Sequence, residues 1–308
     1  MVEKIVTLQK QFALHGLAYF EMCKPKVVFM LLITAFVGMQ LAPNVTQELA
    51  TTRLITMFIA LIGIGLAASA AAIVNHLVDV AIDSKMVRTH KRPMVVGSVN
   101  SHMAKLLATF LAIVSMYILV NYVNLLTALL TFSGLIGYAF IYSLYLKHAT
   151  PQNIVIGGLS GALPPLLGWT AMTNEVSVNG LVLLAIIFFW TPAHFWALAI
   201  DRIEDYKKAK VPMLPVVKGI PHTKNCIINY TFITIIVSYI PVFTGMSGTI
   251  YVVLATALSA WFFYSSIKLK YFPDKTSAIK CFYVSIYYLL GLFMALLVDH
   301  FILVYLSL

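Results

Sequence analysis

The sequence predicts an all-α membrane protein that crosses the bilayer nine times, and two observations support this. Hydrophobic residues make up 61% of the 308-residue chain and charged residues only 10%, with a mean hydropathy of +0.91, whereas soluble domains carry about 25% charged residues. The apolar residues also gather in stretches that are long enough to cross a hydrocarbon core as helices. Because these stretches lack the alternation of barrel strands, we expect helices throughout.

The nine expected spans follow one another with short connections. They are 27–43, 54–78, 103–120, 123–146, 153–172, 180–200, 226–245, 249–267 and 281–301. No soluble domain or linker is visible, so we expect a single domain over residues 1–308, with 1–26 as a cytoplasmic N-terminal segment. No cleavable signal or Arg-rich transit segment is recognisable, which favours a bacterial or archaeal plasma membrane.

The loop charges predict the orientation of the chain. Of 21 Lys and Arg residues, only Arg53 falls outside the N-terminal segment and the loops after the second, fourth, sixth and eighth spans. Since cytoplasmic loops are rich in Lys and Arg, we expect the N-terminus and these loops to face the cytoplasm. The net charge of +10 fits anionic lipid headgroups and an anionic substrate. No basic domain with interleaved aromatic residues is present, so we expect no nucleic acid partner.

The first candidate site lies in NHLVDVAIDSKMVRTHKRPM, at the end of the second span. Asn75, Asp79 and Asp83 recur every four residues, which on one helix stacks them along a single face with about 6 Å of rise per step. Carboxylates at the edge of a span are costly unless they are paired or coordinated, so an unpaired stripe implies a bound cation. Oxygen ligands without a His or Cys partner favour Mg²⁺ over zinc.

A second acidic station repeats the spacing. In AIDRIEDYKKAKVPMLP, Asp201 and Asp205 lie four residues apart at the cytoplasmic end of the sixth span. Five of the eleven acidic residues thus fall in two stations on one membrane face, each followed by cations. Two such elements suit a diphosphate that is held through bridging Mg²⁺ and directly by Arg and Lys.

Two other interpretations of the acids remain open. Asp79 and Asp83 could simply cap the span and pair with Lys85 and Arg88, although this explains only the first station. Paired intramembrane acids also mark ion pathways, as in a cation-coupled transporter. Against a transporter, both stations lie at one face instead of the midplane, and the opposite face offers no polar exit.

The charge arrangement suits ionisation of an allylic diphosphate. Mg²⁺ together with Arg88, Arg92 and Lys147 would stabilise the negative charge that grows on the leaving diphosphate. The aromatic faces of Tyr142 and Tyr145 could shield the allylic cation that remains. For the two tyrosines, an interfacial aromatic belt is the alternative.

The motif N-x-x-x-D-x-x-x-D followed by RTHKRP, together with the second D-x-x-x-D, resembles the UbiA-type intramembrane prenyltransferase superfamily. The branch that farnesylates haem is similar over roughly residues 24–217, in KPKVVFMLLITAFVGM, KHATPQNIVIGGLSGALPPLLGW, WTPAHFWALAI and EDYKKAKVPMLPV. The last third matches only in hydropathy. The resemblance implies nine helices around a central cavity.

The resemblance also implies roles for individual residues. Val80 and Ala81 depart from it by standing where relatives often carry charge, and His148 stands where Arg is expected. The implied roles are Asn75, Asp79 and Asp83 as Mg²⁺ and diphosphate ligands, Arg88 and Arg92 as diphosphate partners, Asp201 and Asp205 as further metal ligands in the second station, and Lys147, Thr150 and Asn153 as a K-x-x-T-x-x-N element.

The implied reaction transfers the farnesyl group of farnesyl diphosphate to a vinyl group of haem b. Haem o and diphosphate would be the products, Mg²⁺ the cofactor, and haem A synthase or terminal oxidase assembly factors the protein partners. A prenyltransferase of the same fold that acts on an aromatic acid such as 4-hydroxybenzoate is the alternative.

Two histidines are candidates for contact with haem. Haem iron commonly takes His as an axial ligand, and His194 lies inside the sixth span, where a polar residue is functional by default. A hydrogen-bonded structural histidine is the alternative there. His76 follows Asn75 and points about 100° away from the acidic stripe, which makes it the weaker candidate.

Overall fold

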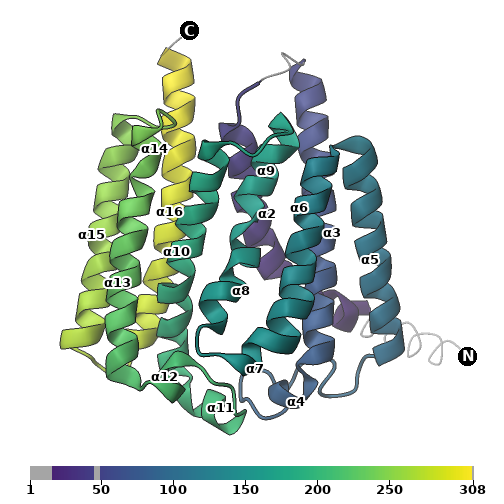
Figure 1. The fold of residues 1–308 in the computed structure, drawn as a ribbon, viewed down its shortest axis with the longest axis vertical. Helices are drawn as coiled ribbons and strands as arrows, with labels where there is room; N and C mark the ends of the chain where they lie inside the picture. The colour runs from purple at the N-terminus through teal and green to yellow at the C-terminus, as the bar shows by residue number, and fades with distance from the viewer. Residues whose placement is uncertain (1–15, 45–48, 307–308) are drawn as a thin grey trace, which may run out of the picture.

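The computed structural model describes residues 16–44 and 49–306, and every regular element in these ranges is a helix (Figure 1). Lys4 and Lys10 of the predicted N-terminal segment lie outside the described residues. After a short helix, Gly16–Met22, the elements are α2 Pro25–Leu41, α3 Ala50–Val78, α4 Val80–Asp83, α5 Ser101–Tyr122, α6 Leu125–Ile136, the π-helix η1 Gly137–Leu146, α7 Lys147–Ala149, α8 Asn153–Ala162, α9 Pro164–Thr173, α10 Val178–Asp201, α11 Ile203–Lys208, α12 Leu214–Val217, α13 Ile220–Ser238, α14 Ile240–Phe243, α15 Thr249–Tyr271 and α16 Ser277–Leu306.

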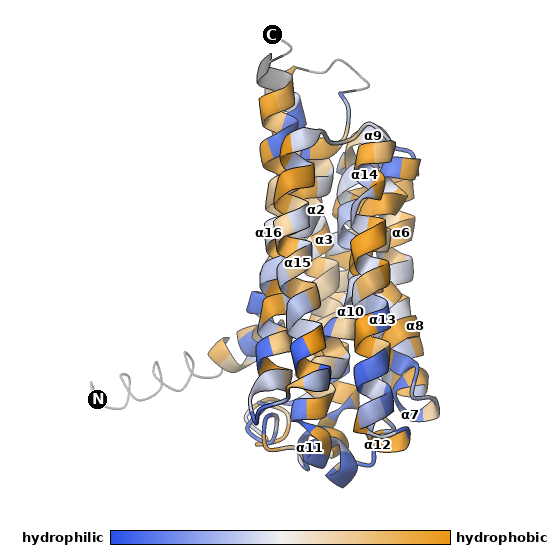
Figure 2. Cartoon of the chain, turned by 90° about the vertical axis from the view of Figure 1, so that its left-hand side faces the viewer, coloured by the Kyte–Doolittle hydropathy of each residue, from blue (hydrophilic) through white to orange (hydrophobic). Residues whose placement is uncertain are grey.

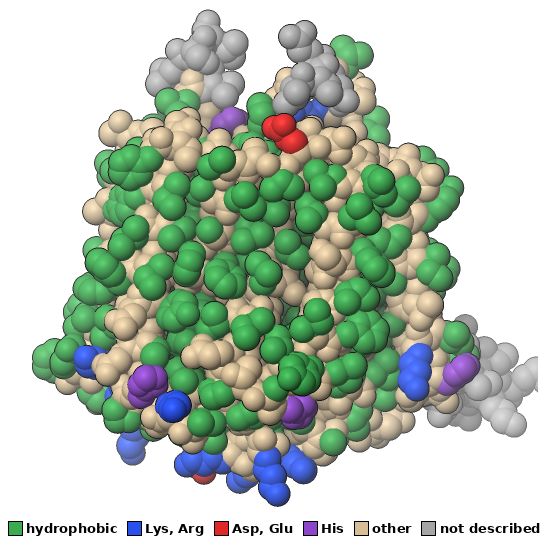
Figure 3. Space-filling model, in the orientation of Figure 1, with side chains coloured by type: hydrophobic (Ala, Val, Ile, Leu, Met, Phe, Trp, Pro, Cys, Tyr) green, Lys and Arg blue, Asp and Glu red, His purple; other side chains and the backbone are tan. Residues whose placement is uncertain are grey.

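The prediction of a polytopic helical membrane protein is confirmed. In the described ranges, eight segments are long and apolar enough to span a membrane, and a ninth follows if Gly16–Met22 and α2, bent by 47°, count as one span. Hydrophobic residues cover the length of the bundle, and hydrophilic ones gather at the end that carries α11 and α12 (Figure 2). The Lys and Arg side chains of the visible face lie mostly at this same end (Figure 3).

Proline residues explain where two predicted spans are interrupted. The fifth span divides at Leu163, because Pro164 and Pro165 lack the N–H groups that would continue α8 into α9. The seventh divides after Ser238, just before Pro241 in α14. Side-chain caps begin other helices: Asn100 accepts two backbone N–H groups of α5.

Glycines bring α2 and α9 into close contact, away from the end of the bundle that carries α4 and α11 (Figure 1). Gly38 of α2 faces the backbone of Pro165, and Gly168 of α9 faces the carbonyl of Ala35, so that a Cβ at either glycine would overlap a carbonyl oxygen. Small residues at such crossings allow backbones to pack closely in membranes. Gly161 of α8, by contrast, has no neighbour within 4 Å of where its Cβ would lie.

We expect Gly168→Ala to destabilise the protein by about 1–3 kcal/mol, because the added methyl group must push α9 away from α2. Gly161→Ala is the matched control, and since Ala favours helix over Gly it should be neutral or stabilising by up to about 1 kcal/mol. The midpoint of thermal unfolding in detergent measures both. Equal midpoints for the two variants would contradict the close approach of these helices.

Candidate active site

The first acidic station lies where α3 ends. The prediction that Asn75, Asp79 and Asp83 share one helix is wrong in detail, because Asp79 adopts φ −85° and ψ 1° and separates α3 from α4. Two backbone hydrogen bonds nevertheless keep the four-residue spacing, from Asp79 N to Asn75 O (3.0 Å) and from Asp83 N to Asp79 O (2.8 Å). All three side chains are buried. We refer to these three residues as the acid ladder.

The acid ladder is not unpaired, which corrects the sequence-based premise. Lys147 Nζ lies 2.6 Å from Asp79 Oδ2, and Arg92 Nη1 lies 2.5 Å from Asp83 Oδ2. Lys24 Nζ donates to Asn75 Oδ1 at 2.6 Å. The partners are therefore not the nearby Lys85 and Arg88 of the simple capping alternative, but cations from three different segments.

The π-helix η1 explains how the fourth span reaches the ladder. Ser143 is buried in η1, and its hydroxyl accepts a hydrogen bond from Asn75 Nδ2 at 3.2 Å. The same Asn75 amide donates to Asp79 Oδ2 at 2.8 Å. Lys147 follows η1 directly as the first residue of α7. Wide helical turns of this kind often occur at functional sites. Here η1 contacts α3 through Ser143 and leads directly into α7, which carries Lys147.

Two buried oxygens of the site have no hydrogen-bond partner among the described residues. They are Asp79 Oδ1 and Asn153 Oδ1, although Asn153 Nδ2 donates to the Lys147 carbonyl at 3.5 Å. A buried acceptor without a partner costs about 1–3 kcal/mol, so each is an attractive contact point for a ligand. Thr150 differs, because its hydroxyl already accepts the Gln152 N–H at 3.2 Å.

The donor set fits Mg²⁺ better than a metal with many protein ligands. In the part of the chain that the structure describes, no group of three or more His, Cys, Asp or Glu side chains converges as a metal cage. Mg²⁺ usually takes only one or two carboxylates and completes its shell with phosphate and water oxygens. Asp79, with its unpartnered Oδ1, and Asp83 supply such carboxylates.

The second acidic station lies at the same end of the bundle as the first (Figure 1). Asp201 ends α10 and pairs with Arg202 Nε at 3.0 Å, and Asp205 is half-buried in α11. Tyr206 is buried in α11, and Arg88, Arg92 and Asp205 lie within electrostatic range of its hydroxyl. Burial raises the pKa of the Tyr206 hydroxyl above its ordinary value, against the opposing effect of the nearby Arg88.

The two candidate tyrosines are placed differently. Tyr142 packs over Gly157 of α8 and stacks on Tyr138 with 5.6 Å between ring centroids. It also lies within electrostatic range of Asp79 and Tyr206. Tyr145 lies on the outer face of η1 with 69% of its surface exposed. The structure therefore brings Tyr142 to the ladder and leaves Tyr145 in the position of an interfacial belt residue.

The two histidines are both buried. His194 stacks between Trp190 and Phe282, with centroids 4.2 and 4.4 Å away, and its Nδ1 lies 2.7 Å from Ser285 Oγ. His76 lies next to the ladder, and its Nδ1 has no partner among the described residues. Lys24 and Arg92 are both within electrostatic range of His76.

Three residues of the site were missed by the motif-based prediction. Lys24 lies in the basic N-terminal segment, Ser143 lies between Tyr142 and Tyr145, and Tyr206 follows Asp205, but the motifs predict no role for these three residues. Only the position of Lys24 could have been recognised from the sequence. It directly precedes Pro25, which begins α2, so its side chain is held near the membrane edge. Lys24 adopts a left-handed conformation, with φ 50°.

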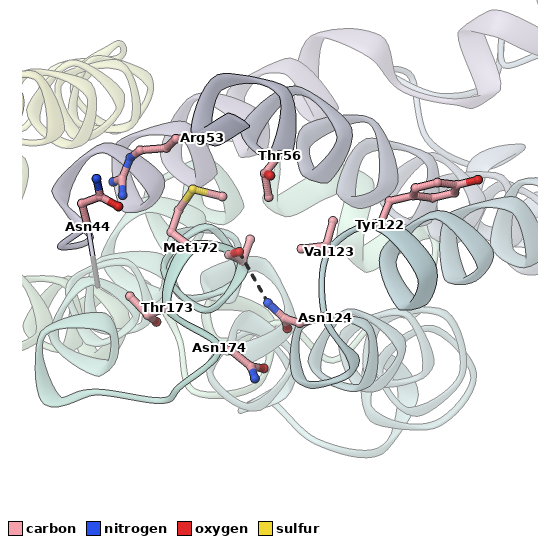
Figure 4. A pocket seen from close by; sticks show the side chains of 10 residues that line it. Asn44, Arg53, Thr56, Tyr122, Val123, Asn124, Met172, Thr173 and Asn174 are labelled. Carbon is pink, nitrogen blue, oxygen red and sulfur yellow. Dashed lines mark hydrogen bonds between the residues drawn. The ribbon is translucent and has the colours of Figure 1, made fainter. Parts of the chain in front are cut away.

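At the opposite end of the bundle, a pocket of about 340 Å³ is lined by Arg53, Asn124 and Asn174 among others (Figure 4). Two charged residues, Arg53 and Asp299, cap helix ends. The Arg53 guanidinium donates to the carbonyls of Met39 and Ala42 at the end of α2. Asp299, buried in α16, accepts the N–H groups of Gly248 and Tyr251 at the start of α15.

Comparison with known proteins identifies the family of the chain. The model of the UbiA prenyltransferase family matches residues 31–297. Protoheme IX farnesyltransferase 2 of Pseudoalteromonas atlantica is 51% identical over 94% of this chain and 93% of its own, and protoheme IX farnesyltransferase 1 of Vibrio parahaemolyticus is 51% identical over 93% of each. Among solved structures, a digeranylgeranylglyceryl phosphate synthase matches with a TM-score of 0.76 at 17% identity, covering 93% of this chain and 98% of that one. A UbiA homologue from Archaeoglobus fulgidus bound to GPP and Mg²⁺ matches with a TM-score of 0.59 at 16% identity, covering 91% of this chain and 99% of that one. The chain is an intramembrane prenyltransferase that belongs to the UbiA prenyltransferase family.

Proposed function

We propose that the protein transfers the farnesyl group of farnesyl diphosphate to a vinyl group of haem b in a Mg²⁺-dependent reaction, producing haem o and diphosphate. The observation that carries the donor chemistry is the buried acid ladder with its orphaned Asp79 Oδ1 beside the Lys147 ammonium. The name shared by relatives at about half identity supports haem as the acceptor. The one-sided distribution of Lys and Arg supports a cytoplasmic position for the ladder.

The ladder and its cations bind and orient the diphosphate. Asp79 and Asp83 would hold Mg²⁺, and Asp201 and Asp205 lie at the same end to approach the diphosphate from the second station. Bound there, Mg²⁺ supplies positive charge that favours departure of the diphosphate. Lys147 and Arg92 donate charged hydrogen bonds to the same leaving group, and Arg88 approaches it from the side of Tyr206.

The bond changes balance without a protein base. The C1–O bond of the farnesyl diphosphate breaks and its electron pair leaves with the diphosphate, so that C1 becomes an allylic cation. The ring of Tyr142 stabilises this cation through its face. The vinyl group of haem b supplies the electron pair for the new carbon–carbon bond. Water then adds to the resulting cation and releases a proton, which gives a hydroxyethylfarnesyl substituent.

Hydrogen bonding at His194 supports its role as a contact for haem. Ser285 Oγ donates its proton to the Phe282 carbonyl at 2.6 Å, so it accepts from His194 Nδ1. The neutral imidazole then carries its lone pair on Nε2, the form that ligates iron. We expect His194→Ala to weaken haem b binding about 10-fold and to change the ligand-field bands of the ferric haem.

The control for this spectral prediction is His222→Ala, because His222 is exposed on α13. Ser285→Ala should change the bands less than His194→Ala. It removes the hydrogen bond that fixes the tautomer of His194 but leaves the imidazole ring in place. Identical haem spectra for wild type and His194→Ala would leave His194 as a structural histidine between α10 and α16.

An assay in membranes tests the proposed function. Haem b, farnesyl diphosphate and Mg²⁺ are incubated with membranes that contain the protein, and the haem is separated by chromatography and weighed by mass spectrometry. We expect a farnesyl-modified haem with the wild type and none with Asp79→Ala. If haem returns unmodified while 4-hydroxybenzoate in a parallel reaction becomes prenylated, the acceptor is an aromatic acid and the proposal for haem is wrong.

A further inference from the structure

Each rung of the acid ladder contacts a different cation of the chain itself. Asn75 accepts from Lys24, Asp79 from Lys147 and Asp83 from Arg92, at 2.6, 2.6 and 2.5 Å. The pair of Asp79 and Lys147 is almost completely buried, with side-chain exposures of 2% and 11%. The groups suited to bind a metal ion are thus in contact with the groups suited to bind an anion.

These contacts oppose the binding of either ligand by itself. A divalent cation at Asp79 and Asp83 must share carboxylate charge with Lys147 and Arg92 and is repelled by them. A diphosphate at Lys147 and Arg92 meets the same conflict with the carboxylates. Screening by salt is weak for buried pairs, so both penalties persist at physiological ionic strength. When both ligands are present, every carboxylate and every cation gains a partner of opposite charge.

We propose that the Asp79–Lys147 and Asp83–Arg92 ion pairs couple metal and diphosphate binding. The metal binds Asp79 and Asp83 strongly only when diphosphate pairs with Lys147 and Arg92, and diphosphate binds these two cations strongly only when the metal is present. This inference rests on the proposed function, because it takes the ladder as the metal site and the two cations as diphosphate contacts. The coupling is reciprocal by thermodynamic necessity and lies in the range of about 5- to 150-fold. A site of this kind accepts the metal and the substrate as a unit.

The first test measures metal binding without any phosphate. Mn²⁺ is titrated into the purified full-length protein in detergent, and free Mn²⁺ is followed by electron paramagnetic resonance. We expect Lys147→Gln to bind Mn²⁺ at least about 5-fold more tightly than the wild type, since it releases Asp79. Arg92→Gln should do the same through Asp83 and provides a second variant if Lys147→Gln fails to fold. Lys85→Gln, which removes an exposed cation from the same loop, should change the affinity by less than about twofold.

The second test measures diphosphate binding without metal. Inorganic diphosphate is titrated calorimetrically in the presence of EDTA. Asp79→Asn should bind it at least about 5-fold more tightly than the wild type, because the substitution removes the negative charge that competes for Lys147. The matched control is Asp274→Asn, which removes an exposed carboxylate from the loop between α15 and α16 and should leave the affinity unchanged.

The outcomes separate this proposal from the proposed function. The coupling is overturned if Lys147→Gln and Arg92→Gln bind Mn²⁺ no more tightly than the wild type, or if Lys85→Gln gains as much as they do, since a general surface field would then be responsible. Farnesylation of haem by the wild type in that case leaves the proposed function intact. Conversely, affinity gains in the ion-pair variants without any haem farnesylation support the coupling and contradict the proposed acceptor.

Discussion

Asp79→Asn is expected to lower the rate of prenyl transfer by at least about 100-fold. The change keeps the size of the side chain but removes the charge and the orphaned oxygen that would bind Mg²⁺, and removing one preorganised electrostatic group from a site of developing charge typically costs about 10²–10³ in turnover. The measurement is the initial rate of farnesyl-haem formation in membranes at saturating Mg²⁺. Because Asn remains a good partner for Lys147, the variant should still insert and fold.

Glu204→Gln is the control for this experiment. Glu204 belongs to the second station, but it is exposed and pairs with Lys207 at 2.9 Å, so its loss should change the rate by less than about twofold. A rate for Asp79→Asn within threefold of the wild type would exclude the ladder from the chemistry. Raising the Mg²⁺ concentration distinguishes two causes of a low rate. The rate recovers if the variant only binds Mg²⁺ more weakly, and it stays low if Asp79 has a role in the reaction itself.

Lys147→Met is expected to lower the free energy of unfolding by about 3–5 kcal/mol. The substitution leaves Asp79 charged, buried and without its ammonium partner, and breaking a buried pair on one side has this cost. Adding Asp79→Asn in the same chain should restore most of the loss, since the orphaned charge disappears. The free energies of unfolding of the wild type, the two single variants and the double variant are measured in mixed detergent and SDS micelles. Together they form a double-mutant cycle.

The cycle also has an outcome that would contradict the structure. If Lys147→Met and Asp79→Asn add independently, the two side chains do not form the pair that joins α7 to the end of α3. A matched pair of variants at the exposed ion pair Lys280–Asp274, 3.5 Å apart, should show a coupling below about 1 kcal/mol.

Much of the architecture follows from the sequence alone. Apolar stretches of a set length predict spans because unsatisfied backbone groups are too costly in lipid for anything but helices. The four-residue spacing of Asn75, Asp79 and Asp83 predicts a shared face, because residues four apart lie on one side of a helix. The structure keeps this arrangement where α3 ends, because backbone hydrogen bonds still join residues four apart. The sequence leaves open whether Tyr142 and Tyr145 face the ladder or form an interfacial belt. The π-helix η1 decides between these alternatives, and it leaves Tyr145 exposed.

The sequence by itself therefore determined the class of fold, the end of the bundle that carries the charges, and the residues of the ladder. Only the tertiary structure decided which cation meets which acid. Lys24, Lys147 and Arg92 lie 51, 68 and 9 positions away from their partners, and long flexible side chains near a membrane edge can reach many acids. Helix packing selects one arrangement among these, because buried charges are stable only when all of them are paired.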